Sequence, residues 1–499
     1  MIRAAEGLPV DIDGWVPMRW PCGPLEIERG ERRQRFSARE ADALREWCEP
    51  RVLERLEGSP VTSLVVTWAD GSAGDESQRR ALAPLVAAAR RRGLAVVGWV
   101  ADAADLRRAA DTAQAAGLSA LASESREPVP GLDVLRFRDR GLADRSPSAF
   151  LGVAGLVWPG LRVTEASDVD ASTGPTGPPW LDSNAWYVRL ARSLVEPRQL
   201  WLAFDPPEIG HPVPAAAYVQ AIADTEVYGG RWVLSLDPHL RLDLAQGRPS
   251  ALETWAAIGR GLAFFRKQRA WTGYVPVGQI GVVSDYAGTN EFLSFEVLNL
   301  LARQGGLFRI LETRRAPETS LHGLDAVLYV DEAPPGGDLA RQLYAFAEAG
   351  GTLITPPGWE ERGTRDDGVW PSRFRVSRHE RGRVAVARED LADPYQLVED
   401  ARLLTSHRHD RLRVFNPGTG QFHYAASGDG RAGVLHTLLY DTPNPRLPMS
   451  VWFREPWAQA GAWSIDGEAT ATARRTAVEP GVEFHPPPLP VYFALELSA

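Results

Sequence analysis

Several carboxylates follow apolar, strand-like segments in the first half of the chain. Hydrolysis of a glycoside needs two such groups: one carboxylic acid protonates the leaving oxygen, and a second carboxylate attacks the anomeric carbon or activates water. Acid–base chemistry on a sugar is therefore open to this chain if its fold brings two of the acids together. The acids are Asp70, Asp102, Glu124, Asp139, Asp205, Glu208 and Asp237.

Each of these acids also has a structural alternative. Asp102 precedes a helical pattern, and its type favours the N-cap of that helix. Asp205 stands before two prolines and fits a turn. Glu124 lies two residues from Arg126 and would pair with it, whereas Glu208 lies in the segment PPEIGHP, which indicates a rigid loop.

Tryptophan is abundant, with 17 residues against 11 Tyr and 16 Phe. An indole face stacks on sugar rings, but tryptophan within a strand also fills a core. The tryptophans near the predicted strand ends are therefore candidates for a sugar platform, with core packing as the alternative. They are Trp20, Trp68, Trp99 and Trp158.

Other chemistries find little support in the sequence. Cys22 and Cys48 give neither a disulfide framework nor a thiolate zinc site. The His407–Asp410 segment has metal-like residue types, but a solvated loop is the better interpretation. The common glycine-rich phosphate loops and the serine elbow are absent from the sequence, so we expect neither a cofactor nor a metal.

Strand-like and helix-like segments alternate from the start to about residue 272. This rhythm predicts a (β/α)₈ TIM barrel over residues 1–272, with a doubly wound open sheet as the alternative. The spacers around the fifth and sixth strands are short, so we expect an irregular barrel. The predicted strands are Asp13–Trp20, Val61–Trp68, Leu94–Val100, Leu118–Ala122, Leu132–Phe137, Phe150–Trp158, Leu200–Phe204 and Arg231–Leu236.

The pattern changes twice after the predicted barrel. Residues 273–372 repeat apolar strands and amphipathic helices, which predicts a flavodoxin-like α/β domain with a parallel sheet. After about residue 380 the period becomes two, and short strands are separated by Gly and Pro. We therefore expect a C-terminal β-sandwich over residues 373–499.

The stretch GLDAVLYVDEAPPGGDLARQLYAFAEAGGTLITPPG, which begins at Gly323, resembles the amidotransferase-like middle domain of family 42 β-galactosidases. The order of barrel, middle domain and terminal β-domain is also that of the family, so the chain looks like a divergent relative. The resemblance implies a middle domain that helps to form a dimer or trimer. Because this stretch contains no cysteine, amidotransferase chemistry is excluded there.

The resemblance also implies roles for individual residues. In retaining enzymes of this kind the acid/base follows strand four and the nucleophile follows strand seven. Those positions correspond to Glu124 for the first role and to either Glu208 or Asp205 for the second. Asp70 and Asp237, together with the four tryptophans, are then the expected substrate-binding residues.

The composition of the chain bears on which kinds of partner it can bind. The net charge of -9 and the pI near 5.6 argue against a nucleic-acid or anionic-membrane surface. The N-terminus lacks a signal-peptide layout, so a cytoplasmic protein is expected. The sequence thus predicts retaining hydrolysis of a glycosidic bond in a carbohydrate substrate. The alternative is a catalytically inactive carbohydrate-binding or assembly protein on the same scaffold.

Overall fold

The computed structural model describes most of the chain from residue 12 to residue 499. Statements about the structure refer to these residues. The segments outside the description are 1–11, 33–35, 103, 126–132, 139–141, 143–148, 156, 163–179, 208–209, 315–320, 361, 367, 442–446 and 475–480.

The chain divides into two compact units. The first, the barrel unit, comprises residues 1–160 and 195–268, and the second comprises residues 161–194 and 269–499. Residues 161–194 were expected inside the barrel, so this part of the predicted boundary differs. Helix α5 (Ala185–Leu194) from this segment packs on α9 (Glu291–Arg303) and β13 (Phe308–Glu312) of the second unit.

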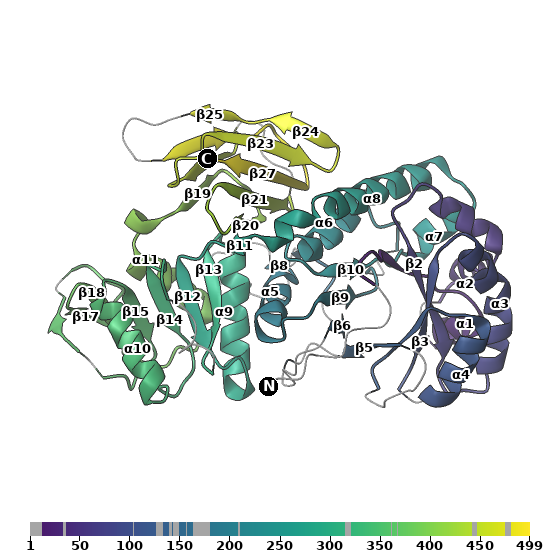
Figure 1. Ribbon diagram of the computed structural model, residues 1–499, viewed down its shortest axis with the longest axis horizontal. Coiled ribbons are helices and arrows are strands. Elements are labelled where there is room, and N and C mark those ends of the chain that lie inside the picture. Colours follow the sequence, from purple (N-terminus) through teal and green to yellow (C-terminus); the bar gives the residue numbers. More distant parts are fainter. Residues whose placement is uncertain are drawn as a thin grey trace. The chain divides into compact units, whose positions relative to one another are not determined.

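Eight parallel strands form the sheet of the barrel unit in the order β1-β2-β3-β4-β5-β6-β9-β10 (Figure 1). All eight predicted strands are present, and a parallel bridge between Met18 and Leu234 joins the first strand to the last. The predicted (β/α)₈ barrel is therefore confirmed. The strands are β1 Pro17–Arg19, β2 Ser63–Ala69, β3 Ala95–Val100, β4 Ala120–Ser123, β5 Val134–Arg138, β6 Phe150–Ala154, β9 Gln199–Ala203 and β10 Arg231–Val233.

Helices of the barrel unit follow the strands unevenly. Among the described residues no helix lies between β4 and β5 or between β5 and β6, which matches the expected irregularity. Ser37 begins α2 with the capping box that its spacing from Glu40 predicts. The helices are α1 Pro24–Glu31, α2 Ala38–Glu46, η1 Pro50–Leu56, α3 Asp75–Arg91, α4 Leu106–Ala116, α6 Ala215–Glu226, α7 Pro238–Ala245 and α8 Pro249–Lys267.

Side chains fill the interior of the barrel. Phe137, Phe150 and Trp201 from three strands pack ring against ring, with centroids 5.7 and 5.3 Å apart. Gly152 is required beside them, because a Cβ there would lie 2.6 Å from the Phe137 ring. The barrel is thus a packed core, and a ligand has access only at its ends.

The first sheet of the second unit has seven strands in the order β13-β12-β14-β15-β18-β17-β16. The five strands from β13 to β18 run parallel, and β17 and β16 continue antiparallel. The strands not yet bounded are β12 Ile280–Ser284, β14 Ala326–Tyr329, β15 Thr352–Thr355, β16 Thr364–Arg365, β17 Phe374–His379 and β18 Gly382–Ala387.

Helices lie on both faces of this sheet. From β12 the chain crosses to β13 on one side through α9, and from β14 it crosses in the other direction through α10 (Gly337–Glu348). Because such crossovers are right-handed, α9 and α10 cover opposite faces. Helix α11 (Pro394–Thr405) contacts α9 and β15. The predicted domain boundary at 372/373 therefore falls inside this layer, since β17, β18 and α11 belong to it.

Two antiparallel sheets complete the second unit. They have the orders β11-β20-β21-β27-β23-β24 and β19-β22-β26-β25, and they share an apolar core that includes Phe453, Phe484 and Leu495. The predicted β-sandwich is present, but it begins near residue 412. Its strands are β11 Val275–Pro276, β19 Leu412–Phe415, β20 Gly420–Ala426, β21 Ala432–Leu439, β22 Ser450–Phe453, β23 Gln459–Ser464, β24 Gly467–Thr470, β25 Thr472–Arg474, β26 Val482–His485 and β27 Tyr492–Ser498.

A few short elements remain. Strands β7 (Gly160–Arg162) and β8 (Trp180–Asp182) pair with each other. Short 3₁₀ turns in the described part of the second unit lie at Arg269–Gly273, Gly288–Asn290 and His407–His409. Across the described residues, no helix is both long and apolar enough to cross a bilayer.

Candidate active site at the barrel mouth

The carboxyl ends of the barrel strands bring a group of polar side chains together. Side chains along a strand alternate between its two faces, and Trp201 and Val233 lie in the interior core. Counting on by two places Asp205 and Ser235 on the inward side, just beyond β9 and β10. The same count from Ala120 and Ala122 places Glu124 inward beyond β4.

Asp205 is an exposed carboxylate held from two sides. Its side chain is 53% exposed, and its Oδ1 accepts a hydrogen bond of 2.8 Å from the Ser235 hydroxyl. The Arg19 Nε lies 3.7 Å from the same oxygen. The negative charge of Asp205 raises the pKa of Arg19 above its ordinary value, against the effect of burial. Asp205 therefore combines solvent access with a fixed position, as a nucleophile requires.

Glu26 forms a second, buried carboxylate next to Arg19. Its Oε1 accepts a hydrogen bond from the Thr67 hydroxyl and lies 3.6 Å from Arg19 and 3.5 Å from Arg29. One guanidinium thus contacts both Glu26 and Asp205, so the two carboxylates lie within about 10 Å of each other. Because its Oε1 is already engaged by Thr67, Arg19 and Arg29, we assign Glu26 to holding Arg19 in place.

Arg241 on α7 is a third arginine close to this group. The residue is 9% exposed, and its Nε and Nη1 have no hydrogen-bond partner among the described residues. Burial lowers the pKa of Arg241, while Glu26 and then Asp205 raise it. The charges of both carboxylates therefore reach this guanidinium, although neither forms an ion pair with it.

Arg19, Glu26, Ser235 and Arg241 were not singled out from the sequence. Ser235 could have been found from the alternation of side chains along a strand, because it lies two residues after the inward-facing Val233. The other three residues reach the site through contacts between segments that are far apart in the chain. Their residue types alone therefore do not predict that they belong to it.

The other predicted site residues occupy varied positions. Asp237 is 2% exposed and caps α7: its Oδ1 accepts from the backbone N–H groups of His239 and Leu240, and its Oδ2 accepts from Val213 N–H and the Tyr218 hydroxyl. These contacts describe a structural role for Asp237.

Asp70 lies in the turn after β2. Burial opposes ionisation there, but hydrogen bonds from Ser72 hold the pKa of Asp70 below its ordinary value. Glu124 is exposed. The expected helix N-cap at Asp102 is wrong, because Asp105 caps α4. Glu208 and Asp139 lie outside the described residues.

The four predicted platform tryptophans separate into two kinds. Trp20 and Trp68 are 0% and 2% exposed, so the core alternative holds for them. Trp99 is partly buried against Phe137 at 4.9 Å and faces the barrel interior near the carboxyl end of β3. Trp158 is also partly buried and packs edge-on against Tyr218 and Trp232. Trp99 is thus the tryptophan best placed to meet a sugar.

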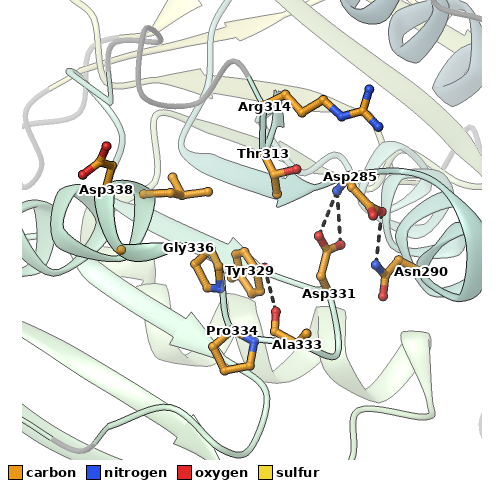
Figure 2. A pocket seen from close by; sticks show the side chains of 13 residues that line it. Asp285, Asn290, Thr313, Arg314, Tyr329, Asp331, Ala333, Pro334, Gly336 and Asp338 are labelled. Carbon is orange, nitrogen blue, oxygen red and sulfur yellow. Dashed lines mark hydrogen bonds between the residues drawn. The ribbon is translucent and has the colours of Figure 1, made fainter.

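The second unit has a cavity of about 610 Å³ at the carboxyl ends of β12 and β14, where the strand order reverses (Figure 2). Ligands of open α/β sheets often bind at such a point. In Figure 2 the Asp331 carboxylate accepts from the Asp285 backbone N–H at 2.9 and 3.2 Å, and Asn290 donates to Asp285 at 3.1 Å. These carboxylates are therefore engaged in holding the cavity wall.

The predicted solvated loop at His407–Asp410 is an ion-paired turn. His407 and Arg413 both contact the Asp410 carboxylate, at 3.2 and 3.0 Å. Within the described part of the chain, no group of three or more His, Cys, Asp or Glu side chains could hold a metal ion.

Comparison with solved structures shows that the fold of this chain occurs in a known protein. No protein-family model and no curated protein sequence matches the chain. Among solved structures, the chain is similar to the alpha-L-fucosidase isoenzyme 2 from Paenibacillus thiaminolyticus, with a TM-score of 0.57 at 11% identity. The match covers 97% of this chain and 99% of that one. At this identity the likeness establishes the fold, and it does so over the whole chain.

Two weaker likenesses involve other glycosidases. One is an exo-beta-1,4-mannosidase from Opitutaceae bacterium strain TAV5, with a TM-score of 0.46 at 13% identity, covering 78% of this chain and 95% of that one. The other is a beta-galactosidase from Rahnella sp. R3, with a TM-score of 0.38 at 10% identity, covering 85% and 66%. Membership of family 42 itself stays a prediction.

Proposed function

We propose that the barrel unit hydrolyses a glycosidic bond with retention of configuration, and that Asp205 is the nucleophile. The observation that carries this proposal is the exposed, inward-facing Asp205 carboxylate, held by Ser235 and Arg19 at the carboxyl end of a barrel strand. Active sites of such barrels lie at this end. The fold that the chain shares with a protein named as a fucosidase supports the same class of reaction.

Glu124 is the proposed acid/base. It follows β4 on the inward side and is exposed, so it can exchange protons with solvent between turnovers. In the proposed reaction Glu124 protonates the glycosidic oxygen while Asp205 attacks the anomeric carbon. Glu124 then removes a proton from the water that releases the sugar. Glu208 remains the alternative nucleophile, and Trp99 is the proposed stacking surface.

A panel of aryl glycosides tests this proposal. We expect Asp205→Asn and Glu124→Gln each to lower kcat/KM by about 10³-fold or more, because each removes a group that forms or breaks a bond. The matched control is Asp111→Asn, an exposed carboxylate on α4. Full activity in both site variants would overturn the residue assignment. Sugar binding without hydrolysis of any aryl glycoside would favour the inactive, carbohydrate-binding alternative.

We also propose that the second unit mediates homo-oligomerisation. Two large apolar side chains on its helices are exposed, Phe292 on α9 at 68% and Leu403 on α11 at 54%. The two helices contact each other, and a contiguous apolar patch across them would be a suitable interface. Light scattering should report a dimer or trimer, and Phe292→Ser should shift it toward the monomer. A wild-type monomer at micromolar concentration would contradict this proposal.

A further inference from the structure

The charges at the barrel mouth do not pair off completely. Asp205 is held by Arg19, and Glu26 lies between Arg19 and Arg29. Each carboxylate therefore has a guanidinium within 4 Å. Arg241 is the third guanidinium, and it forms no ion pair or hydrogen bond through its side chain with any described residue.

Asp237 does not supply the missing partner of Arg241. Its two oxygens are already engaged by three backbone N–H groups and the Tyr218 hydroxyl, at distances from 2.8 to 3.2 Å. It also caps the positive end of α7, which compensates its charge further. Arg241 thus has no direct acceptor, although the charge of Asp237 also raises its pKa from a distance.

A buried guanidinium without acceptors is costly. Arg241 is 9% exposed, and two of its three guanidinium nitrogens are fully covered without a partner. Each buried, unsatisfied donor costs about 1–3 kcal/mol, and more when it is charged. Arginine cannot lose its proton to relieve this cost. An anion that reaches Nη2 from outside the chain would offset part of this cost through its charge.

The position of Arg241 brings it to the site. It lies one helical turn after Asp237, and long side chains of a helix point back toward its N-terminus. The N-terminus of α7 follows directly on the carboxyl end of β10. The guanidinium therefore points toward the end of the barrel where Asp205 and Ser235 lie.

We infer that the substrate carries an anionic group, a sugar carboxylate or a sulfate ester, and that Arg241 binds this group. Nη2, the one guanidinium nitrogen that is not fully covered, can donate a charge-assisted hydrogen bond to either group. Binding would give the Arg241 charge a direct acceptor. The inference rests on the proposed function, since it assigns a substrate class to the same site.

Matched aryl glycosides test the inference. Each set has the same leaving group and anomeric configuration and differs only at C6, as hexose, hexuronic acid or hexose 6-sulfate. We expect wild type to prefer one of the anionic members. Arg241→Gln should lower kcat/KM for that member about 10- to 100-fold more than for the neutral hexoside. Arg241→Lys keeps the charge but not the fork, and should fall in between.

Arg248→Gln is the control, because Arg248 is 61% exposed and pairs with Asp243 at the end of α7. Thermal melting checks that each variant is folded. If Arg241→Gln does not fold, the preference of the wild type for an anionic member still decides the matter. Calorimetric titration with free hexuronic acid, free hexose and inorganic sulfate separates binding from hydrolysis.

The outcomes separate the two proposals. Hydrolysis of neutral hexosides as fast as of both anionic members overturns the anionic-substrate inference and leaves the glycosidase function intact. Arg241-dependent binding of hexuronic acid or sulfate without any hydrolysis supports the inference and overturns the function. Neither binding nor hydrolysis of any probe overturns both.

Discussion

Ser235 forms a hydrogen bond to the Asp205 carboxylate, and the effect of this bond can be measured on its own. Its hydroxyl donates to Oδ1 at 2.8 Å, so it fixes the orientation of the carboxylate. A hydrogen bond to a charged group contributes about 1.5–3 kcal/mol. We predict that Ser235→Ala lowers kcat about 10- to 100-fold, with a smaller change in KM.

The comparison variant for Ser235→Ala is Ser77→Ala. Ser77 is exposed on α3, and its hydroxyl donates only to a backbone carbonyl. Equal kinetics in Ser235→Ala and wild type would contradict a supporting role of the Ser235 hydroxyl for Asp205.

Two buried histidines of the second unit give a residue-scale prediction about pH. His423 and His436 stack at 5.9 Å on β20 and β21, and burial lowers the pKa of His436 to about 3. Burial, followed by Arg189, lowers the pKa of His423. Below pH ~6.5 these histidines are therefore protonated in the unfolded chain but stay neutral in the folded chain.

Stability of the second unit should consequently fall as the pH drops from about 6.5 toward 3. His436 alone should reduce the free energy of unfolding by about 2 kcal/mol at pH 5 relative to neutral pH. Differential scanning calorimetry from pH 5 to pH 8 measures this, and His436→Gln should flatten the slope. The exposed His322→Gln is the control. A slope unchanged in His436→Gln would contradict the assignment.

At the residue scale, part of the candidate site could be predicted from the sequence. Asp205 could be found because it follows an apolar strand in a segment whose place in a barrel is predictable. Its partners could not be found. Arg19 lies far from Asp205 in the chain, and only closure of the barrel between β1 and β10 brings the two together.

At the scale of elements, α7 links the stability of the barrel to the site. Asp237 begins this helix, and Arg241 lies on its first turns. We predict that Asp237→Ala lowers the free energy of unfolding by about 2 kcal/mol or more, because a cap is lost and buried donors lose their acceptor. Chemical denaturation of wild type and variant measures it.

The same variant tests whether Asp237 binds substrate. If Asp237 has a structural role, Asp237→Ala lowers the free energy of unfolding. It also changes the ratio of the KM values for a neutral and an anionic substrate, because a disturbed α7 displaces Arg241. A rise in KM for every substrate with unchanged stability would restore direct substrate binding as the role of Asp237.

Close packing at the start of β18 gives a second prediction for an element. A Cβ on Gly382 would lie 2.2 Å from the backbone oxygens of Ala347 and Gly351, which cannot swing away as a side chain does. Gly382→Ala should therefore destabilise the second unit by about 1–3 kcal/mol. Gly428→Ala is the control, since a Cβ there meets nothing within 4 Å. Equal melting temperatures would contradict this packing.

Elements were predictable where their pattern was local. The eight barrel strands followed from apolar runs separated by helix signals. Strand β18 lies where the sequence predicts short strands, but whether it joins the parallel sheet or the sandwich depends on partner strands elsewhere in the chain. For the same reason α5 was expected in the barrel, although its apolar face packs on α9.

At the scale of the whole molecule, catalysis and assembly are assigned to different units. The barrel unit holds the exposed Asp205 and Arg241, whose guanidinium has no hydrogen-bond partner among the described residues. The second unit contains no cysteine, and its Asp285 and Asp331 are engaged in hydrogen bonds. The order of the units was predictable from the change of hydrophobic period along the chain. The substrate was not, because it depends on which side chains meet at the mouth.

The most direct test of the central claim is covalent trapping of the nucleophile. A retaining enzyme forms a glycosyl–enzyme ester, and 2-deoxy-2-fluoro glycosyl fluorides slow its hydrolysis enough for mass spectrometry. With a set of these fluorides, including hexuronic acid members, we predict that one labels the protein on Asp205. Sequencing of the labelled peptide separates Asp205 from Glu208. A label on any other residue, or turnover that persists in Asp205→Asn, would contradict Asp205 as the nucleophile.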